Sequence, residues 1–239
     1  MPGIAPAEPL CLVGDLHGRS DLLKRFLSLR DHHFPGHRIV FLGDAVDRGH
    51  DSAGVLDLLR AQQAREPSTL CLAGNHEAML LQFMDDPAGD QGRRWLAHGG
   101  LDTLASFGLR GVPQDGAARE AARDALRAAM GAVTEDWLRN LPRFWQSGNL
   151  VAVHAALDPA LPPEAQDEQP MLWGHRDFGR KPRPDGLWVA HGHVIVEKAF
   201  ARQGRIALDT GAYATGMLSY ALIDPSLPET ERVTLAAVP

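Results

Sequence analysis

The sequence predicts an α/β fold, of the α+β kind, in which two mixed β-sheets pack together and are flanked by helices. In the first third of the chain, apolar runs at 10–13, 38–42 and 69–73 each lead through a short polar cluster into a helical pattern. The second half consists mostly of strand-like runs. With 239 residues, of which 44% are hydrophobic, the chain can bury one sizeable core, so we expect a single domain over residues 1–239.

The first third of the chain is expected to form three successive strand and helix units, because apolar side chains recur at helical spacing after each polar cluster. These units are a strand at 10–14 with a helix at 20–32, a strand at 38–42 with a helix at 52–65, and a strand at 69–72 with a helix that carries Met79, Leu80 and Phe83.

Residues from about 85 to 146 are predicted to form a helical insertion. They show no clear strand and include the helical segment 117–130. Their larger apolar side chains have helical spacing, and we interpret them as core residues: Trp95, Leu96, Leu101, Leu104 and Phe107. Strands are expected afterwards at 149–153, 187–190, 205–208, 217–223 and 232–238, with a Pro-rich loop at 159–184.

Charge and composition argue against a nucleic-acid-binding protein and against a membrane protein. The net charge of −6 and a sequence pI near 6.0 give no basic footprint for nucleic acid or for an anionic membrane surface. The N-terminal stretch MPGIAPAEPL lacks the features of a signal peptide, and no later run approaches the roughly 20 apolar residues that span a bilayer. We therefore expect a soluble cytoplasmic protein, in which Cys11 and Cys71 pack as buried thiols rather than forming a disulfide. The sequence leaves the oligomeric state open.

Four polar clusters follow strands and carry side chains that bind metals: GDLHG at 14–18, GDAVDRG at 43–49, GNHE at 74–77 and HAAL at 154–157. The carboxyl ends of strands are where open α/β sheets place ligand sites. Each cluster taken alone can also be explained as a turn, because Gly, Asp and Asn are common in turns that follow strands. Their occurrence together, in order and each after a strand, favours a shared site.

The residue types indicate a binuclear centre. Asp15 and His17 are two residues apart in a segment expected to be extended, so they can face the same side and bind one ion. A carboxylate at Asp44 can bridge two ions, while Asn75, His154 and a later histidine provide oxygen and nitrogen ligands for the second. This mixed set favours two divalent cations of the Mn, Fe or Zn type, with Mn preferred over the other two.

Two such cations can activate a bridging hydroxide as the nucleophile of an in-line displacement at phosphorus. Arg48 is suited to bind the phosphate oxygens in a bidentate manner. His76 is placed to protonate the leaving group, and Asp47 to hold and orient the His76 imidazole.

The four clusters and the GH step at 192–193 resemble the motifs of calcineurin-like metallophosphoesterases, specifically the phosphoprotein phosphatase branch with its small bacterial and phage members. The resemblance spans most of residues 10–224 and implies the two-sheet sandwich of that family. It implies Asp15 and His17 on one metal, Asp44 bridging, Asn75, His154 and His193 on the other, Arg48, Asn75 and Arg176 on phosphate, and His76 with Asp47 as the acid.

For two of these roles, the last metal ligand and the second phosphate-binding arginine, the sequence offers more than one interpretation. The last ligand falls on His193 in HGHVIVEK rather than on His191, and alternation is expected to put both on one face. Many members of the family have an arginine directly before GNHE, where this sequence has Ala73. Bacterial members of the family tend to have an arginine shortly after a Leu-Trp pair, and this resemblance assigns Arg176 in LWGHRDF to phosphate, with a solvated loop arginine as the alternative.

The favoured function is a serine/threonine phosphoprotein phosphatase that hydrolyses phosphomonoesters by direct attack of a metal-bridging hydroxide. Its substrate would be a phosphorylated protein or a small phosphoester, and phosphotyrosine stays open. The alternative is a dinucleoside polyphosphate hydrolase. Asp47 favours the phosphatase, because the resemblance suggests a neutral residue at that position in symmetrical dinucleoside tetraphosphate hydrolases. A third, minor alternative is a non-catalytic metal-binding regulator.

Overall fold

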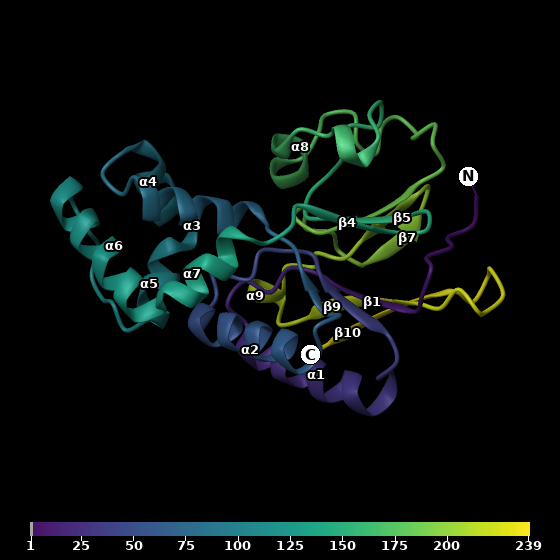
Figure 1. The fold of residues 1–239 in the computed structure, drawn as a ribbon, viewed down its shortest axis with the longest axis horizontal. Coiled ribbons are helices and arrows are strands. Elements are labelled where there is room, and N and C mark those ends of the chain that lie inside the picture. Colours follow the sequence, from purple (N-terminus) through teal and green to yellow (C-terminus); the bar gives the residue numbers. More distant parts are fainter. Residues whose placement is uncertain (1) are drawn as a thin grey trace.

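The computed structural model describes residues 2–239 and contains two mixed five-stranded sheets that pack face to face (Figure 1). The first sheet has the strand order β10-β9-β1-β2-β3 and the second the order β4-β5-β6-β8-β7. The strands are β1 Leu10–Val13, β2 Arg38–Phe41, β3 Leu70–Cys71, β4 Phe144–Ser147, β5 Leu150–Val153, β6 Trp188–His191, β7 Phe200–Arg202, β8 Arg205–Ala207, β9 Leu218–Ile223 and β10 Val233–Val238. The predicted two-sheet fold is confirmed.

Alternating side chains of β1 show why a short apolar run can occupy the centre of the molecule. Leu10 and Leu12 pack into the layer between the two sheets, whereas Cys11 and Val13 face the helices on the other side. All four are fully buried, because β1 lies between β2 and β9 with both faces covered. Cys11 and Cys71 are buried free thiols.

Helices α1, Ser20–His33, and α2, Ser52–Arg65, cover the outer face of the first sheet (Figure 1). Asp51 begins α2, since its side chain accepts the backbone N–H of Gly54 at 3.0 Å. Both helices match the predicted ranges to within one residue. They fix the loops that precede them, and those loops carry two of the polar clusters.

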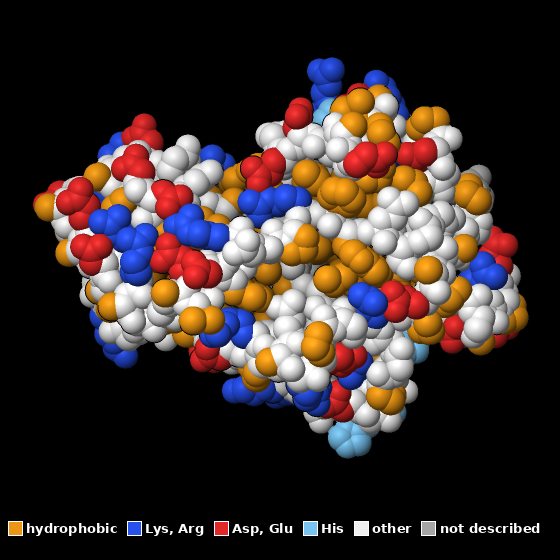
Figure 2. Space-filling view, viewed as in Figure 1, with side chains coloured by type: hydrophobic (Ala, Val, Ile, Leu, Met, Phe, Trp, Pro, Cys, Tyr) orange, Lys and Arg blue, Asp and Glu red, His pale blue; other side chains and the backbone are white. Residues whose placement is uncertain are grey.

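The helical insertion stands to one side of the two sheets (Figure 1). It follows α3, Asn75–Asp85, and contains α4 Asp90–Trp95, a π-type turn Leu96–Gly100, α5 Leu101–Ser106, α6 Gly116–Met130 and α7 Ala132–Arg139. Positively and negatively charged side chains are interspersed over its surface (Figure 2). Trp95 is fully buried and Leu104 nearly so, in line with the predicted core.

Several elements differ from the sequence prediction. Strand β4 begins at Phe144, inside the expected helical insertion, and pairs antiparallel with β5. The short β7, the helix α8 at Glu168–Trp173 and the helix α9 at Ala212–Thr215 have no counterpart in the prediction. β4 and β7 are half-exposed edge strands, so they lack the continuous apolar pattern of the central strands. Within residues 2–239, no helix combines the length and apolar character needed to cross a membrane.

Candidate metal centre

The polar clusters follow the carboxyl ends of strands, and side chains from different clusters lie close together. Five of the six non-glycine residues with positive φ in residues 2–239 belong to these clusters or to the GH step at 192–193: His17, Asp44, Asp47, Arg48 and His193. A left-handed conformation costs about 1–3 kcal/mol for such residues and persists only where the surroundings enforce it. The backbone is therefore held in a strained form at the place where the polar side chains converge.

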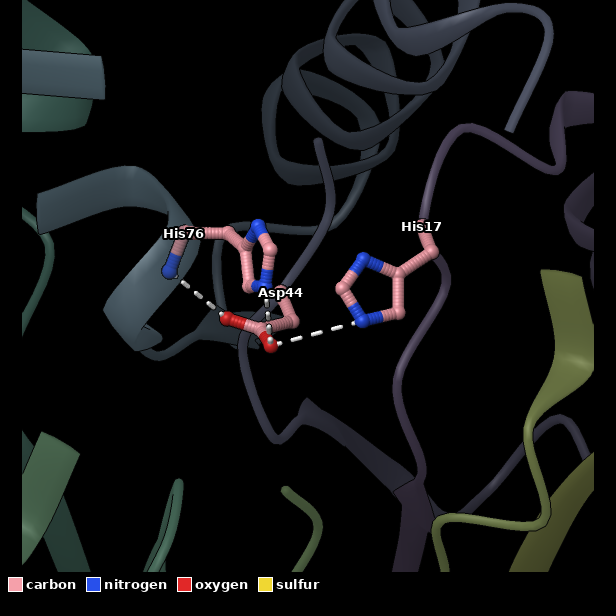
Figure 3. A group of neighbouring side chains, drawn as sticks. All are labelled: His17, Asp44 and His76. Atoms are coloured by element: carbon pink, nitrogen blue, oxygen red, sulfur yellow. Dashed lines mark hydrogen bonds and ion pairs between the residues drawn. The ribbon is translucent and has the colours of Figure 1, made fainter. Parts of the chain in front are cut away.

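Asp44 stands at the centre of two groups of ligand atoms. The first group joins Asp44 to His17 and His76, as Figure 3 shows, and the second joins Asp44 to His154 and His193. Within each group the ligand atoms lie within 4.8 Å of one another. Asp44 Oδ2 is 3.5 Å from His17 Nε2 and 4.0 Å from His76 Nε2, and Asp44 Oδ1 is 3.4 Å from His154 Nε2. A carboxylate shared by both groups is the arrangement expected of a bridging ligand.

Asn75 belongs with the second group. Its Oδ1 lies 2.9 Å from both His154 Nε2 and His193 Nδ1, so one oxygen and two nitrogens converge on a small volume. The other ring nitrogen of His154 lies 2.9 Å from the Leu42 carbonyl, and this contact directs Nε2 into the site. Burial lowers the pKa of His154 to about 3, which keeps the ring neutral as metal binding requires.

His17 is oriented in the same way, because its Nδ1 lies 2.9 Å from the Val46 carbonyl and its Nε2 points towards Asp44. The segment from Asp15 to His17 is not extended as the sequence predicted, because the backbone of His17 has φ of 43°. The Asp15 carboxylate accepts from the backbone N–H of His193 at 3.1 Å.

Buried carboxylates gather in this region, among them Asp15, Asp44 and Asp209. Burial, followed by the charges of Asp209 and Asp44, raises the pKa of Asp15 well above its usual range. Burial likewise raises the pKa of Asp44 to about 6. Carboxylates crowded in a buried site repel one another, and bound cations relieve that repulsion. The donor set and its charge therefore fit a binuclear centre of divalent cations.

Asp47 and His76 form a buried pair beside this centre. Asp47 Oδ2 is 2.7 Å from His76 Nδ1, and both side chains are almost completely buried. Burial raises the pKa of Asp47 to about 8, against the effect of hydrogen bonds from Thr103 and Trp95, and it lowers the pKa of His76. Since Nδ1 faces Asp47, only His76 Nε2 is directed at the metal ligands.

Arg48 lies beside the ligand His17. It is exposed, its Nη1 is 3.3 Å from His17 Nε2, and its guanidinium carbon is 5.1 Å from the centre of the Tyr213 ring. The Tyr213 ring also stands edge-on to His17 at 5.4 Å. Arg176 is exposed and forms no hydrogen bond or ion pair with any residue from 2 to 239, so its assignment to phosphate stays a prediction.

His193 and His191 point in different directions. The His193 ring packs against His154 at 5.1 Å, whereas the His191 ring packs against Phe178 at 5.0 Å. The expected alternation fails because β6 ends at His191 and the backbone of His193 has φ of 64°. This geometry supports His193, and not His191, as the last ligand.

The structure adds side chains that the sequence interpretation did not assign to the site. Glu77 is the last residue of GNHE, and its buried carboxylate accepts backbone N–H groups from the Asp44 loop. Asp209 lies next to Asp15. Trp95 and Thr103 reach Asp47 from the insertion. Glu77 could have been assigned from the GNHE motif. Asp209, Trp95 and Thr103 could not, because their contacts with the site depend on the tertiary structure.

Comparisons with known proteins agree with this site. A family model described as calcineurin-like phosphoesterase matches residues 9–197. Serine/threonine-protein phosphatase 1 of Salmonella typhimurium is 42% identical over 92 residues, which cover 37% of this chain and 38% of that protein. The symmetrical bis(5'-nucleosyl)-tetraphosphatase of Dechloromonas aromatica is 29% identical over 147 residues, which cover 62% of this chain and 43% of that protein.

Among solved structures, the cold-active protein-tyrosine phosphatase of a psychrophilic Shewanella species has the same fold. Its TM-score is 0.63 at 18% identity, and the alignment covers 100% of this chain and 83% of that one. The chain spans less than half the length of the two curated relatives above. The match of the family model to most of the sequence, together with two His and Asp ligand groups that share Asp44, shows that this chain belongs to the calcineurin-like phosphoesterase family.

Proposed function

We propose that this protein is a metal-dependent serine/threonine phosphoprotein phosphatase. The observation that carries the proposal is the buried contact of 2.7 Å between Asp47 and His76, which presents an imidazole nitrogen to the metal site. An alkoxide leaving group, as in phosphoserine and phosphothreonine, needs a proton to depart. A phosphate leaving group, as in a phosphoanhydride, needs it far less. A dedicated acid pair therefore favours an ester substrate.

Six side chains are proposed to hold the metals: Asp15, His17, Asp44, Asn75, His154 and His193. Two divalent cations, when bound there, supply Lewis acidity to the phosphoryl group and lower the pKa of water. Oxygen and nitrogen donors together suit Mn, Fe or Zn, and we propose Mn as the metal that supports activity.

Arg48 and Asn75 are proposed to bind the phosphate. Arg48 is exposed beside His17, and its planar guanidinium can bind two phosphate oxygens at once. The Asn75 amide Nδ2 donates no hydrogen bond to residues 2–239, whereas its Oδ1 faces the ligand histidines. His76 Nε2 then lies on the side from which a proton can be given to the leaving oxygen.

A dinucleoside polyphosphate hydrolase is the second candidate. It is favoured by the extent of the similarity to the symmetrical tetraphosphatase, which covers 62% of this chain against 37% for the Salmonella phosphatase. The two candidates share the metal site and differ in the leaving group.

The test is phosphate release by metal-stripped protein after addition of Mn²⁺, with a phosphothreonine peptide, a phosphotyrosine peptide and diadenosine tetraphosphate assayed side by side. We expect the phosphothreonine peptide to be hydrolysed fastest, as judged by kcat/KM, with Asp44→Asn as the inactive control. Faster hydrolysis of the dinucleotide would transfer the protein to the second candidate. Metal binding without release from any of the three would support a non-catalytic regulator.

A further inference from the structure

The Asp47 carboxylate, which contacts His76, also accepts hydrogen bonds from two residues of the helical insertion. Trp95 Nε1 donates to its two oxygens at 3.1 and 3.0 Å, and Thr103 Oγ1 donates to Oδ1 at 2.6 Å. These residues are 48 and 56 positions away from Asp47 in the sequence. Asp47, Trp95 and Thr103 each have an exposed fraction of 0%.

The chemistry of the two donors fixes the orientation of the carboxylate. An indole N–H can only donate, so the Asp47 oxygens must accept at Trp95. The Thr103 hydroxyl contacts Asp47 twice, because its oxygen is also 3.0 Å from the Asp47 backbone nitrogen. The backbone of Asp47 has φ of 73°, a conformation that this second contact helps to maintain.

The orientation matters because Oδ2 of the same carboxylate contacts His76 Nδ1. With Asp47 fixed in place, the imidazole keeps Nδ1 towards Asp47 and Nε2 towards the metal ligands. Loss of either donor would free the carboxylate to turn, and a small error in the position of a catalytic group lowers the rate substantially.

We propose that Trp95 and Thr103 are positioning residues for the His76 acid, which makes the helical insertion a working part of the active site. The proposal rests on the acid role given to His76 in the proposed function. It assigns to the insertion a task other than packing, since Trp95 also fills the core against Phe83 at a ring distance of 4.6 Å.

The test compares variants that remove one hydrogen-bond donor; Thr103→Val keeps the volume of the side chain, whereas Trp95→Phe also makes it smaller. Trp95→Phe removes the indole N–H, and Thr103→Val removes the hydroxyl. The insertion offers matched controls: the Trp137 indole donates to Gln63 at 2.6 Å, away from Asp47, and Trp137→Phe removes that bond. Thr103→Ser keeps the hydroxyl and serves as the conservative variant.

Each variant is assayed with Mn²⁺ on phenyl phosphate and on p-nitrophenyl phosphate. The quantity compared with wild type is the ratio of kcat for phenyl phosphate to kcat for p-nitrophenyl phosphate. Phenolate departs poorly without a proton, whereas p-nitrophenolate departs readily. General acid catalysis contributes roughly 10²–10⁴-fold, so partial loss of orientation should lower the ratio about tenfold in Trp95→Phe and Thr103→Val. Trp137→Phe and Thr103→Ser should keep the wild-type ratio.

Two further readouts separate positioning from general damage to the fold. In a His76→Asn background, Trp95→Phe should lower the ratio no further, because the acid is already absent. In nitrogen-15 spectra of the metal-free protein, Asp47→Asn should shift the indole N–H resonance of Trp95 and leave that of Trp137 in place.

The proposal is overturned if both esters slow equally in Trp95→Phe and Thr103→Val, if neither slows, or if Trp137→Phe changes the ratio as much. A wild-type ratio that is unaffected by His76→Asn would also overturn it, because His76 would then not act as the acid. Aryl phosphates do not test the preference for phosphoproteins. Failure of the phosphothreonine peptide assay alone would therefore contradict the proposed substrate class and leave the role of Trp95 and Thr103 standing.

Discussion

The buried carboxylate of Glu77 organises the loop that carries Asp44, and its removal gives a sharp test of how the site is built. Glu77 Oε2 accepts the backbone N–H groups of Gly74 and Asp44 at 2.8 and 2.9 Å. Its Oε1 accepts those of Ala45 and Val46 at 2.8 and 3.2 Å. Glu77→Gln replaces one oxygen by an NH₂ group, so in either orientation of the amide two backbone donors face another donor.

A buried donor left without a partner costs about 1–3 kcal/mol, so two of them should lower the free energy of unfolding by about 2–6 kcal/mol. This is a large part of the roughly 5–15 kcal/mol that stabilises a typical domain. The assay is urea unfolding of the metal-free protein, followed by tryptophan fluorescence. Glu120→Gln, at an exposed position of α6, is the matched control and should change stability by less than about 0.5 kcal/mol. A loss in Glu77→Gln no greater than in the control would refute the role of the carboxylate.

Three other perturbations have defined outcomes. A Cβ at position 192 would overlap the Asp15 carboxylate, so Gly192→Ala should weaken Mn²⁺ binding by about tenfold or more, as measured by calorimetry. Gly36→Ala is the control and should leave Mn²⁺ binding unchanged, because a Cβ there would have nothing within 4 Å. The hydrogen bond from Arg19 lowers the pKa of Asp21 from its ordinary value of 3.8 to about 2. The Asp21 carboxylate therefore stabilises the fold at a pH above 3.8, and this contribution is lost as the pH falls through about 2. The difference in unfolding free energy between wild type and Asp21→Asn should therefore shrink with falling pH, and a constant difference would contradict the assignment. Chelation of metal should lower the melting temperature of wild type and have a smaller effect on Asp44→Asn.

The elements that could be predicted from the sequence are those whose pattern is local. β1, β2 and β5 are buried on both faces, so each reads as a continuous apolar run, and each ends at a polar cluster. The strands at sheet edges, β4 and β7, are half-exposed and carry no such pattern. The ranges of α1 and α2 were predictable because apolar side chains recur at helical spacing after each polar cluster.

The parts of the site that escaped prediction depend on backbone conformation or on distant contacts. The spacing of Asp15 and His17 suggested an extended segment, but the backbone at His17 has a positive φ. Trp95 was interpreted correctly as a core residue, yet its N–H bond to Asp47 crosses 48 residues and has no counterpart in the local pattern. A periodic pattern identifies which face of a helix is buried, but not which polar atom that face meets.

A pair of divalent cations in one site is the property on which the roles of all these residues depend, and Mn²⁺ binding to the metal-stripped protein measures it most directly. Calorimetric titration, with the metal content checked by mass spectrometry, should give about two Mn²⁺ per wild-type chain and fewer in Asp44→Asn. Phosphate release should appear only as the metals bind. A wild-type protein that binds no Mn²⁺, Fe²⁺ or Zn²⁺, or that hydrolyses phosphoesters equally well with a chelator present, would contradict the binuclear centre.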